Sequence, residues 1–533
     1  MKKLKLLIME KNRWWLPFIL SIAVCVGLSL GYYVTRNRVF TSGGYDGNRL
    51  QKLQDILNLV ENNYVDDVNP DKVFEESIVE MLHKLDPHSN YIPASEQQRA
   101  AEIIEGKFGG VGMRYFVLRD TVCITHVIKG SPSEKIGIKA GDKILKIDGK
   151  NVASVKIESD KVMSMLKGKE GTRVKVELVR QKKKMSFEII RGTIPIESVA
   201  SYYLLGDVGY IKIDQFSVTT AEEFRAAAAE LTSKGMKKLI IDVRNNGGGV
   251  LGSATEIVDE FLKDGKLILK TIGKKIGTKV YKATSVGDLE NIPLVVLINA
   301  GSASASEILA GALQDNDRGI IVGRRSFGKG LVQEDTKLRD GSVIRLTIAR
   351  YYTPTGRCIQ RPYNGKYDQY YMDRGEENDA ELYKPDSSIF VDSLKFKTPK
   401  GKIVYGGGGI MPDIFVPFDS TGSNMYYTAL RVSPVFQAFS FDYVENKRGQ
   451  WKSVDDFIVR FNVDDMLLAQ FVSYAQREYK IPVVKNSVFQ SKKQILRLLK
   501  AQIAQQLFDD LGFYKVYNSE DNEFLKALEV LKK

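Results

Sequence analysis

The sequence predicts a multidomain α/β protein, with helical regions at both ends and two strand-containing units between them. The first observation is length, because 533 residues exceed an ordinary single domain and favour three or four folded units. The second is a run of short strands and glycine turns from about 105 to 191. The third is an alternation of buried strands, glycine turns and helices after 196, which is typical of crossover connections on a partly parallel sheet.

The composition is that of globular domains, with 43% hydrophobic and 27% charged residues. The net charge is +13, but the lysines are scattered and no basic motif is interleaved with aromatic residues, so nucleic-acid binding is not expected. Three cysteines (Cys25, Cys123 and Cys358) form no disulfide framework. No Cys/His/acidic spacing typical of metal ligands occurs, and neither a metal nor another cofactor is expected.

The N-terminus has the pattern of a membrane anchor. A basic segment, 1–13, precedes an apolar segment, 14–34, whose length of about 21 residues suffices to cross a hydrocarbon core as a helix. Aromatic residues that suit the two interfaces bracket it: Trp14, Trp15, Tyr32 and Tyr33. The basic flank is expected to stay cytoplasmic, which predicts a single-pass inner-membrane protein whose bulk is periplasmic or otherwise extracytoplasmic. The alternative is a cleaved signal peptide, although no small-x-small cleavage site follows.

A helical N-terminal domain is predicted over 48–104. Its first helix carries apolar residues at helical spacing, namely Leu53, Ile56, Leu57 and Val60. A second helix is expected to stop before Pro87, and a third to begin near Ser95, with Gln98 completing a capping box. His88 lies in the proline-bounded turn between them, and we expect it to be structural.

The strand-rich region, 105–193, contains KGSPSEKIGIKAGDKILKIDGKNV, with a Ser-Pro helix start and an Asp-Gly hairpin. This stretch resembles a PDZ domain. Such a resemblance implies that the preceding loop, GGVGMR, binds a peptide C-terminal carboxylate through backbone amides while the peptide adds a strand to the sheet. The candidate residues are Gly109, Gly110, Val111 and Gly112. The alternative is that these glycines only permit a tight turn.

The α/β core is predicted over 196–417, with a Tyr-, Asp- and Gly-rich insertion at about 356–409. A helical region, 418–533, follows. Its amphipathic helices could form a homo-oligomer contact, although such helices are more often ordinary core.

A serine-rich turn in the core, GSASASE, follows the buried strand IPLVVLINA and opens a helix expected over Ala303–Gln314. A serine at a helix start would lie beside free backbone N–H groups and the positive end of the helix dipole, as an acyl-transfer nucleophile requires. The neighbouring strand ends in NNGGG, which could supply a second N–H. These residues alone leave Ser302, Ser304 and Ser306 open.

The base for such a serine would be a lysine, because His83, His88 and His126 are the only histidines and all lie upstream. Lys329, within SFGKG, could serve if burial lowered its pKa. Gln333 lies four residues later and could orient the amine by a hydrogen bond.

The combination of a PDZ-like region with GSASASE and SFGKGLVQ resembles the carboxyl-terminal processing proteases, the Ser–Lys peptidases of family S41, over about 48–417. The resemblance implies a crotonase/ClpP-like core. The family's spacing of 25 residues selects Ser304 as nucleophile for Lys329, with Gln333 supporting the lysine. The implied oxyanion donors are the amide of Ala305 and that of Gly247 or Gly248.

The resemblance implies an ATP-independent serine endopeptidase that processes envelope proteins near free C-termini recognised by the PDZ domain. Two departures are visible: NNGGG lacks the Pro or Ser common before its last two glycines, and Lys167 replaces an arginine found in many relatives. Two alternatives remain. One is a non-catalytic PDZ scaffold or chaperone on a protease-like fold. The other is a crotonase-type acyl enzyme, for which no nucleotide-pocket motif occurs.

Overall fold

The computed structural model describes residues 18, 21–27, 47–285, 287–385 and 392–532, and the chain divides after Val79 into two compact units. The predicted basic segment, 1–13, and most of the predicted anchor, 14–34, lie outside the described residues. Among the residues that are described, no helix is long and apolar enough to cross a membrane.

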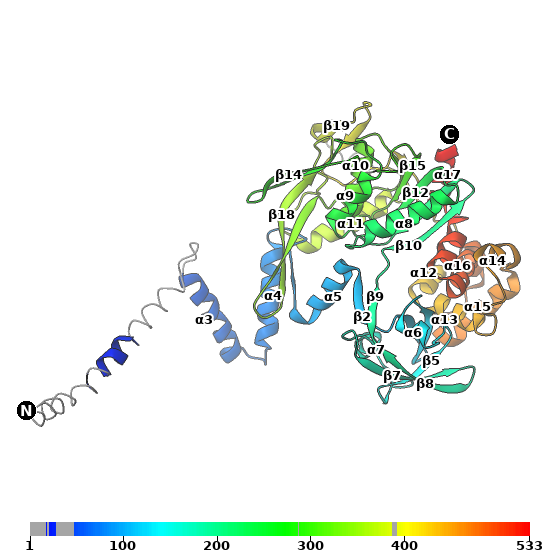
Figure 1. The fold of residues 1–533 in the computed structure, drawn as a ribbon, viewed down its shortest axis with the longest axis horizontal. Helices are drawn as coiled ribbons and strands as arrows, with labels where there is room; N and C mark the ends of the chain where they lie inside the picture. Colours follow the sequence, from blue (N-terminus) through cyan, green and yellow to red (C-terminus); the bar gives the residue numbers. More distant parts are fainter. Residues whose placement is uncertain (1–17, 19–20, 28–46, 286, 386–391, 533) are drawn as a thin grey trace, which may run out of the picture. The chain divides into compact units, whose positions relative to one another are not determined.

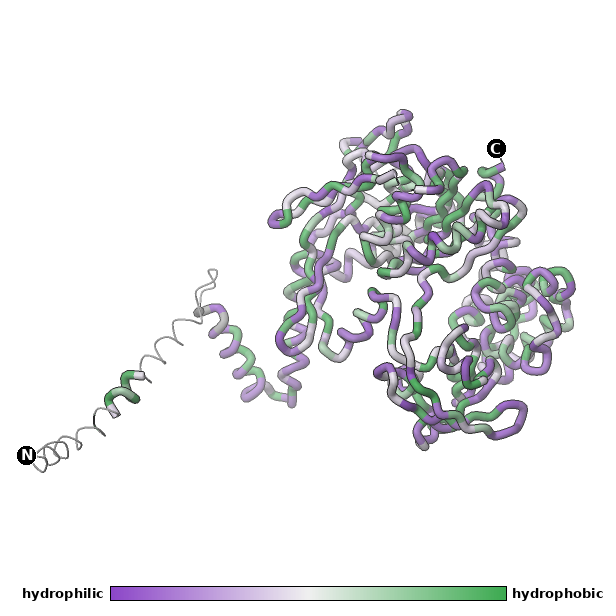
Figure 2. Tube along the Cα trace, in the orientation of Figure 1, coloured by the Kyte–Doolittle hydropathy of each residue, from purple (hydrophilic) through white to green (hydrophobic). Residues whose placement is uncertain are grey.

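The first unit contains helix α3 (Gly47–Asn63) and most of α4 (Pro70–His83). Hydrophilic and hydrophobic residues alternate along α3, as the apolar spacing predicted (Figure 2). Helix α4 begins at a proline, whose missing N–H costs nothing at the first helical position. The side chain of Asn69 caps it by accepting the N–H of Lys72 at 3.1 Å.

The second unit opens with strand β1 (Asn90–Ile92) and helix α5 (Ala94–Glu105). The predicted cap at Ser95 is wrong, because α5 already begins at Ala94 and its N-cap position is Pro93. Proline pre-sets the backbone there, and its carbonyl accepts the first helical N–H groups. Gly106, with φ of +71°, ends the helix in the left-handed conformation that favours glycine.

The predicted PDZ region forms an antiparallel sheet in the order β3-β4-β5-β7-β8, with β3 at one edge. Its strands are β3 (Met113–Leu118), β4 (Thr121–Val127), β5 (Lys143–Ile147), β6 (Lys150–Asn151), β7 (Arg173–Arg180) and β8 (Lys183–Ile190). Helices α6 (Pro132–Lys135) and α7 (Ser159–Leu166) complete it. Strands β2 (Lys107–Gly110) and β9 (Gly192–Pro195) pair with each other and lead in and out. Positive φ at Asp148 and Gly149 forms the predicted Asp-Gly hairpin.

The core is built on a six-stranded sheet in the order β10-β11-β12-β15-β16-β21, parallel except for the β10–β11 pair. The strands are β10 (Val199–Leu205), β11 (Val208–Ile213), β12 (Lys238–Asp242), β15 (Leu294–Ile298), β16 (Ile320–Gly323) and β21 (Ile414–Phe415). The parallel order places the carboxyl ends of β12, β15 and β16 at one edge, where a site on this class of sheet is expected.

Helices cover both faces of this sheet, and successive residues of each strand pack alternately against the helices on one face and on the other. On one face, α8 (Thr220–Ser233), α9 (Leu251–Asp259) and α10 (Ala305–Asp315) pack over residues such as Ile241 and Val296 (Figure 1). On the other face, α17 (Asn522–Lys532) packs over residues such as Ile240 and Val295. The continuous apolar strands therefore follow from burial on both faces.

A second sheet lies beside α10 and joins β1 to the core in the order β1-β18-β13-β14, with β17 also paired to β18. Its further strands are β13 (Leu267–Gly273), β14 (Gly277–Lys282), β17 (Leu331–Lys337) and β18 (Val343–Tyr352). The predicted insertion contains α11 (Tyr367–Glu381), the 3-10 turn η2 (Asp392–Leu394) and the hairpin of β19 (Lys395–Lys397) and β20 (Ile403–Tyr405).

The C-terminal helices share one hydrophobic cluster. They are α12 (Met425–Val432), α13 (Val435–Val444), α14 (Val454–Arg460), α15 (Asp465–Tyr479) and α16 (Lys485–Asn518). Leu118 and Cys123 of the PDZ region enter the same cluster. An ion pair of 2.7 Å joins Arg119 to Asp442, so the PDZ region contacts these helices through both apolar and charged groups.

Candidate active site

The serine-rich turn distinguishes its three serines by their hydrogen bonds. Ser302 is buried and its Oγ donates to the carbonyl of Val243 at 2.8 Å. Ser306 is also buried, and its Oγ donates to the carbonyl of Asn246 at 2.9 Å. Ser304 is only partly buried, and its Oγ donates to no acceptor within the described part of the chain. Ser304 is therefore the serine whose hydroxyl is available.

Ser304 occupies a sharp turn between β15 and α10. Its φ of +53° is a conformation that residues other than glycine seldom adopt, and such local strain is typical of functional turns. The positive φ also explains why α10 begins at Ala305 and not at the predicted Ala303. The N–H of Ala305, at the start of α10, donates to no acceptor among residues that the structure describes. This N–H and the helix dipole favour negative charge beside Ser304.

The NNGGG loop lies directly against Ser304. A Cβ at Gly248 would come within 2.7 Å of Ser304 Cβ, and φ there is +100°, so only glycine fits. The Gly248 N–H donates to Asn246 Oδ1 at 2.8 Å and is therefore engaged. The Gly247 N–H has no acceptor in the described ranges, and Gly247 is exposed. Of the two predicted donors, Gly247 thus has the free N–H.

The predicted base, Lys329, has the environment that lowers an amine pKa. Burial, and secondarily the charge of Arg345, lower the pKa of Lys329 to about 8. Its Nζ donates to Gln333 Oε1 at 2.8 Å, as the spacing predicted. The amide nitrogen of Gln333 in turn donates to the main-chain carbonyl of His88, which fixes the orientation of the glutamine side chain.

His88 acts through its backbone carbonyl rather than its ring. Asp86 Oδ1 accepts the N–H groups of His88 and Ser89, each at 2.8 Å, and so holds the turn that presents this carbonyl. Burial, together with the nearby charge of Lys329, lowers the pKa of the His88 imidazole to about 3, so the ring is neutral. Its ring meets Phe327 edge-on, with centroids 6.0 Å apart.

Sequence reasoning missed Glu307, which joins the serine turn to the lysine loop. Its carboxylate is fully buried, and one oxygen accepts the backbone N–H groups of Ser304 at 2.9 Å and Lys329 at 2.8 Å. The other oxygen accepts Ser326 Oγ at 2.6 Å and the Gly328 N–H at 2.7 Å. The spacing Ser-x-x-Glu at a helix start could have signalled it, although not its contacts with the lysine loop.

Tyr351 makes a second link between the same segments. Its buried hydroxyl donates to the carbonyl of Lys329 at 2.9 Å and lies 3.4 Å from that of Ser304. Among the described residues, no hydrogen bond joins Ser304 Oγ to Lys329 Nζ. The amine instead donates a hydrogen bond to Gln333 Oε1. The fold thus brings both backbones together, while the two side chains are not yet hydrogen-bonded, which is common in structures without substrate.

The predicted carboxylate loop of the PDZ region lies between β2 and β3. Gly109 and Gly110 belong to β2 and pair with Thr193 and Gly192. The carbonyls of Val111 and Gly112 face α6, where they accept Ser133 Oγ at 2.6 Å and Ser131 Oγ at 3.1 Å. The N–H groups of Val111 and Gly112 have no acceptor among the described residues. The loop therefore offers two free amides next to edge strand β3.

Lys167, one of the two departures noted in the sequence analysis, lies near this loop. Its Nζ donates to Glu102 Oε2 at 2.5 Å and lies 4.4 Å from the ring centroid of Phe108. In this structure it therefore connects the PDZ region to helix α5.

Comparisons with known proteins agree with this architecture. The family model for peptidase family S41 matches residues 207–365, and a PDZ domain model matches 109–190. A carboxy-terminal-processing protease of Bartonella bacilliformis is 36% identical over 319 residues, covering 58% of this chain and 73% of the relative. The chain belongs to peptidase family S41. The predicted PDZ domain and S41 core are thereby confirmed.

Further relatives of this S41 protease carry related descriptions. Carboxy-terminal processing protease CtpA of Bacillus subtilis is 34% identical over 356 residues, 66% of this chain and 76% of the relative. The solved structure of a photosystem II D1 C-terminal processing protease is 25% identical with a TM-score of 0.35, covering 70% of this chain and 94% of that one. Residues 426–509 match a family of unknown function, DUF8443. The protein is a C-terminal processing serine endopeptidase with a PDZ domain.

Proposed function

We propose that this S41 protease cleaves its substrates with Ser304 as nucleophile and Lys329 as general base, supported by Gln333. The observation that carries the proposal is the Glu307 carboxylate, which accepts the backbone N–H groups of both Ser304 and Lys329. The Ser304 Oγ–H, which donates to no acceptor among the described residues, and the lowered pKa of Lys329 support it further. No ATP-binding element is needed, because peptide hydrolysis is downhill.

In this mechanism, neutral Lys329 takes the proton of Ser304 Oγ as that oxygen bonds to the scissile carbonyl carbon. The resulting oxyanion is stabilised by the N–H groups of Ala305 and Gly247. Lys329 then gives the proton to the leaving amine as the C–N bond breaks. A water, deprotonated by Lys329, then attacks the acyl-enzyme carbonyl carbon. The ester C–O bond breaks, and Lys329 returns the proton to Ser304 Oγ. Gln333 keeps the amine oriented throughout.

The rate of cleavage is expected to rise with pH through about 8 and then level off. The lysine must be unprotonated to accept the serine proton, and its pKa is lowered to about 8. Below that pH the protonated amine predominates and kcat/KM falls about tenfold per pH unit. A profile of kcat/KM between pH 6 and 10 measures this. A plateau extending down to pH 6 would contradict a lysine base.

The PDZ domain is proposed to present substrates by their free C-terminal carboxylate. The unengaged N–H groups of Val111 and Gly112, next to edge strand β3, support this role. The proposed location is the extracytoplasmic face of the cytoplasmic membrane, with envelope proteins as substrates. This part rests on the basic and apolar pattern of residues 1–34.

A peptide with an apolar C-terminus and a free carboxylate is expected to be cleaved with a KM at least about tenfold lower than its C-terminal amide, since hydrogen bonds to a charged acceptor contribute roughly 1.5–3 kcal/mol each. The two peptides should share a similar kcat, because the cleavage site is unchanged. Ser304→Ala serves as the inactive control. Equal kcat/KM for the two peptides would show that the protease does not recognise the free carboxylate.

A further inference from the structure

A buried charged cluster lies between helix α17 and the carboxyl ends of β12 and β16. It includes two arginines that share one carboxylate. Glu523, near the start of α17, contacts Arg244 Nη1 through Oε2 at 2.5 Å. Its other oxygen lies 2.6 Å from Arg324 Nη1. The side chains of Glu523, Arg244 and Arg324 are each about nine-tenths buried, being 9%, 11% and 12% exposed. The C-terminal helix thus pairs with two separate strand ends of the core.

Each arginine lies a few residues before a loop of the candidate active site, one before the glycine loop and the other before the lysine loop. Arg244 follows β12 and is three residues before Gly247 in the NNGGG loop. Arg324 follows β16 and is five residues before Lys329. A shift of either strand end would therefore move an oxyanion donor or the base relative to Ser304.

Arg244 is held on several sides. Asp242 accepts its Nη2 at 2.7 Å, Asp521 accepts its Nη1 at 2.8 Å, and its carbonyl accepts Lys212 Nζ at 2.7 Å. The side chain of Arg324 has fewer polar partners: it pairs with Glu523 and reaches the carbonyl of Val416 at 3.5 Å, and its Cζ lies 5.8 Å from the ring centroid of Phe418. The Glu523 carboxylate therefore couples a side chain that has many polar partners to one that has few.

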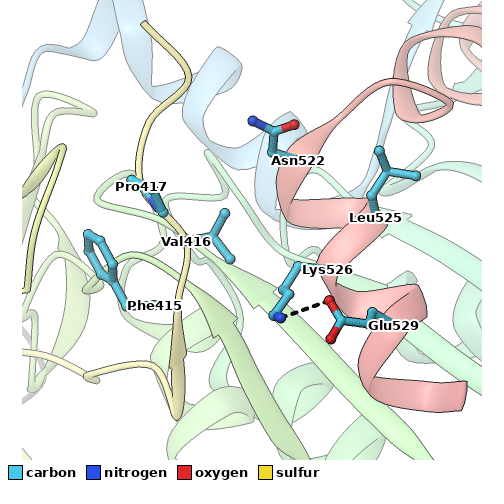
Figure 3. Close-up of a pocket in the computed structure, with 7 residues that line it drawn as sticks. All are labelled: Phe415, Val416, Pro417, Asn522, Leu525, Lys526 and Glu529. Atoms are coloured by element: carbon cyan, nitrogen blue, oxygen red, sulfur yellow. Dashed lines mark hydrogen bonds and ion pairs between the residues drawn. The ribbon is translucent and has the colours of Figure 1, made fainter. Parts of the chain in front are cut away.

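Helix α17, which carries this carboxylate, packs against the core sheet. Phe524 and Ala527 are buried against the sheet, and Asp521 Oδ1 accepts the Phe524 N–H at 2.9 Å. The outward face of α17 instead lines a shallow pocket of about 340 Å³ with residues 415–417 (Figure 3). There Glu529 pairs with Lys526 at 2.8 Å and is 52% exposed.

We infer that Glu523 is a positioning residue for peptide hydrolysis, which sets the spacing between the glycine loop and the lysine loop by holding Arg244 and Arg324 together. The inference rests on the proposed roles of Ser304, Lys329 and Gly247. Glutamine at this position has one acceptor oxygen and an NH₂ group that would face an arginine. Glu523→Gln should therefore release one strand end while keeping the side-chain volume.

The experiment compares Glu523→Gln with Glu529→Gln in the full chain, on one peptide with a free carboxylate. Glu523→Gln is expected to lower kcat at least about tenfold, since displacements of about 1 Å at a reacting centre can cost about a hundredfold. KM should change less than about twofold, because the PDZ domain is untouched. Labelling of Ser304 by a fluorophosphonate should slow in proportion to kcat. Glu529→Gln, the same change on the exposed face of the same helix, should behave as wild type.

Because Glu523→Gln could also loosen α17, Arg324→Gln tests the coupling from the other side with α17 unchanged. Arg324→Gln should reproduce the loss in kcat, and the double variant should lose no more than either single variant. Equal kcat for Glu523→Gln and Glu529→Gln, with Ser304→Ala inactive, would overturn this inference alone. Wild-type cleavage retained by Ser304→Ala would overturn the proposed function and the inference with it. Additive losses in the double variant would also refute the coupling.

Discussion

Lys329→Ala is expected to lower kcat by about 10³–10⁴-fold with little change in KM, the scale seen when one member of a nucleophile–base pair is removed. The loss follows from the site, because the imidazole of His88, the histidine in this region, has a pKa lowered to about 3 and is too weak a base to replace the amine. The residual rate would come from the N–H groups of Ala305 and Gly247, which the substitution leaves in place.

Lys329→Arg is the informative companion variant, measured in the same assay. Arginine keeps the charge but stays protonated at every usable pH, so it should be as inactive as alanine. Lys337→Ala, at the exposed end of β17, controls for loss of positive charge. The Ser304→Ala/Lys329→Ala double variant should be no worse than either single variant, because the pair acts as a unit. Activity in Lys329→Arg would exclude lysine as the base.

The sequence carried enough local pattern to predict the order of domains and a helix after the serine turn, although that helix begins at Ala305 and not at Ala303. Buried strands of β-branched residues followed by glycine turns predicted the parallel sheet, and the spacing of Lys329 and Gln333 predicted a hydrogen bond that the structure contains. The predicted N-cap at Ser95 was wrong because Pro93 occupies the N-cap position of this helix. The helical backbone already begins at Ala94, which makes Pro93 the N-cap, and residue type alone does not decide at which position the helix starts.

The contacts that support the site are long-range and left no periodic signal. Gln333 donates to the carbonyl of a residue 245 positions away, and Arg244 contacts a carboxylate 279 positions away. Backbone carbonyls have no sequence signature, since every residue carries one. The choice among the three serines likewise needed either the family spacing or the structure, where Ser302 and Ser306 donate to strand-end and loop carbonyls.

Glu307→Gln is expected to lower kcat by about a hundredfold and to weaken the fold locally, although it changes one atom. All four partners of this buried carboxylate donate hydrogen bonds to it: the N–H groups of Ser304, Lys329 and Gly328, and Ser326 Oγ. Glutamine would turn an NH₂ group toward two of these donors in either orientation. Hydrogen bonds to a charged acceptor contribute about 1.5–3 kcal/mol each, so roughly 3–6 kcal/mol of local stabilisation is at stake.

The kinetic loss should come from geometry, because Glu307 touches the backbone of both reacting residues and is expected to contact no substrate. Amide hydrogen exchange over residues 301–333 should therefore quicken together with the fall in kcat, while exchange in the PDZ domain stays unchanged. Glu256→Gln, an exposed carboxylate on neighbouring helix α9, should alter neither measurement. If Glu307→Gln kept wild-type kcat while exchange over 301–333 quickened, the serine turn and the lysine loop would not need this carboxylate for their alignment. Tyr351, whose hydroxyl reaches the carbonyls of both Ser304 and Lys329, would then be the remaining link between them.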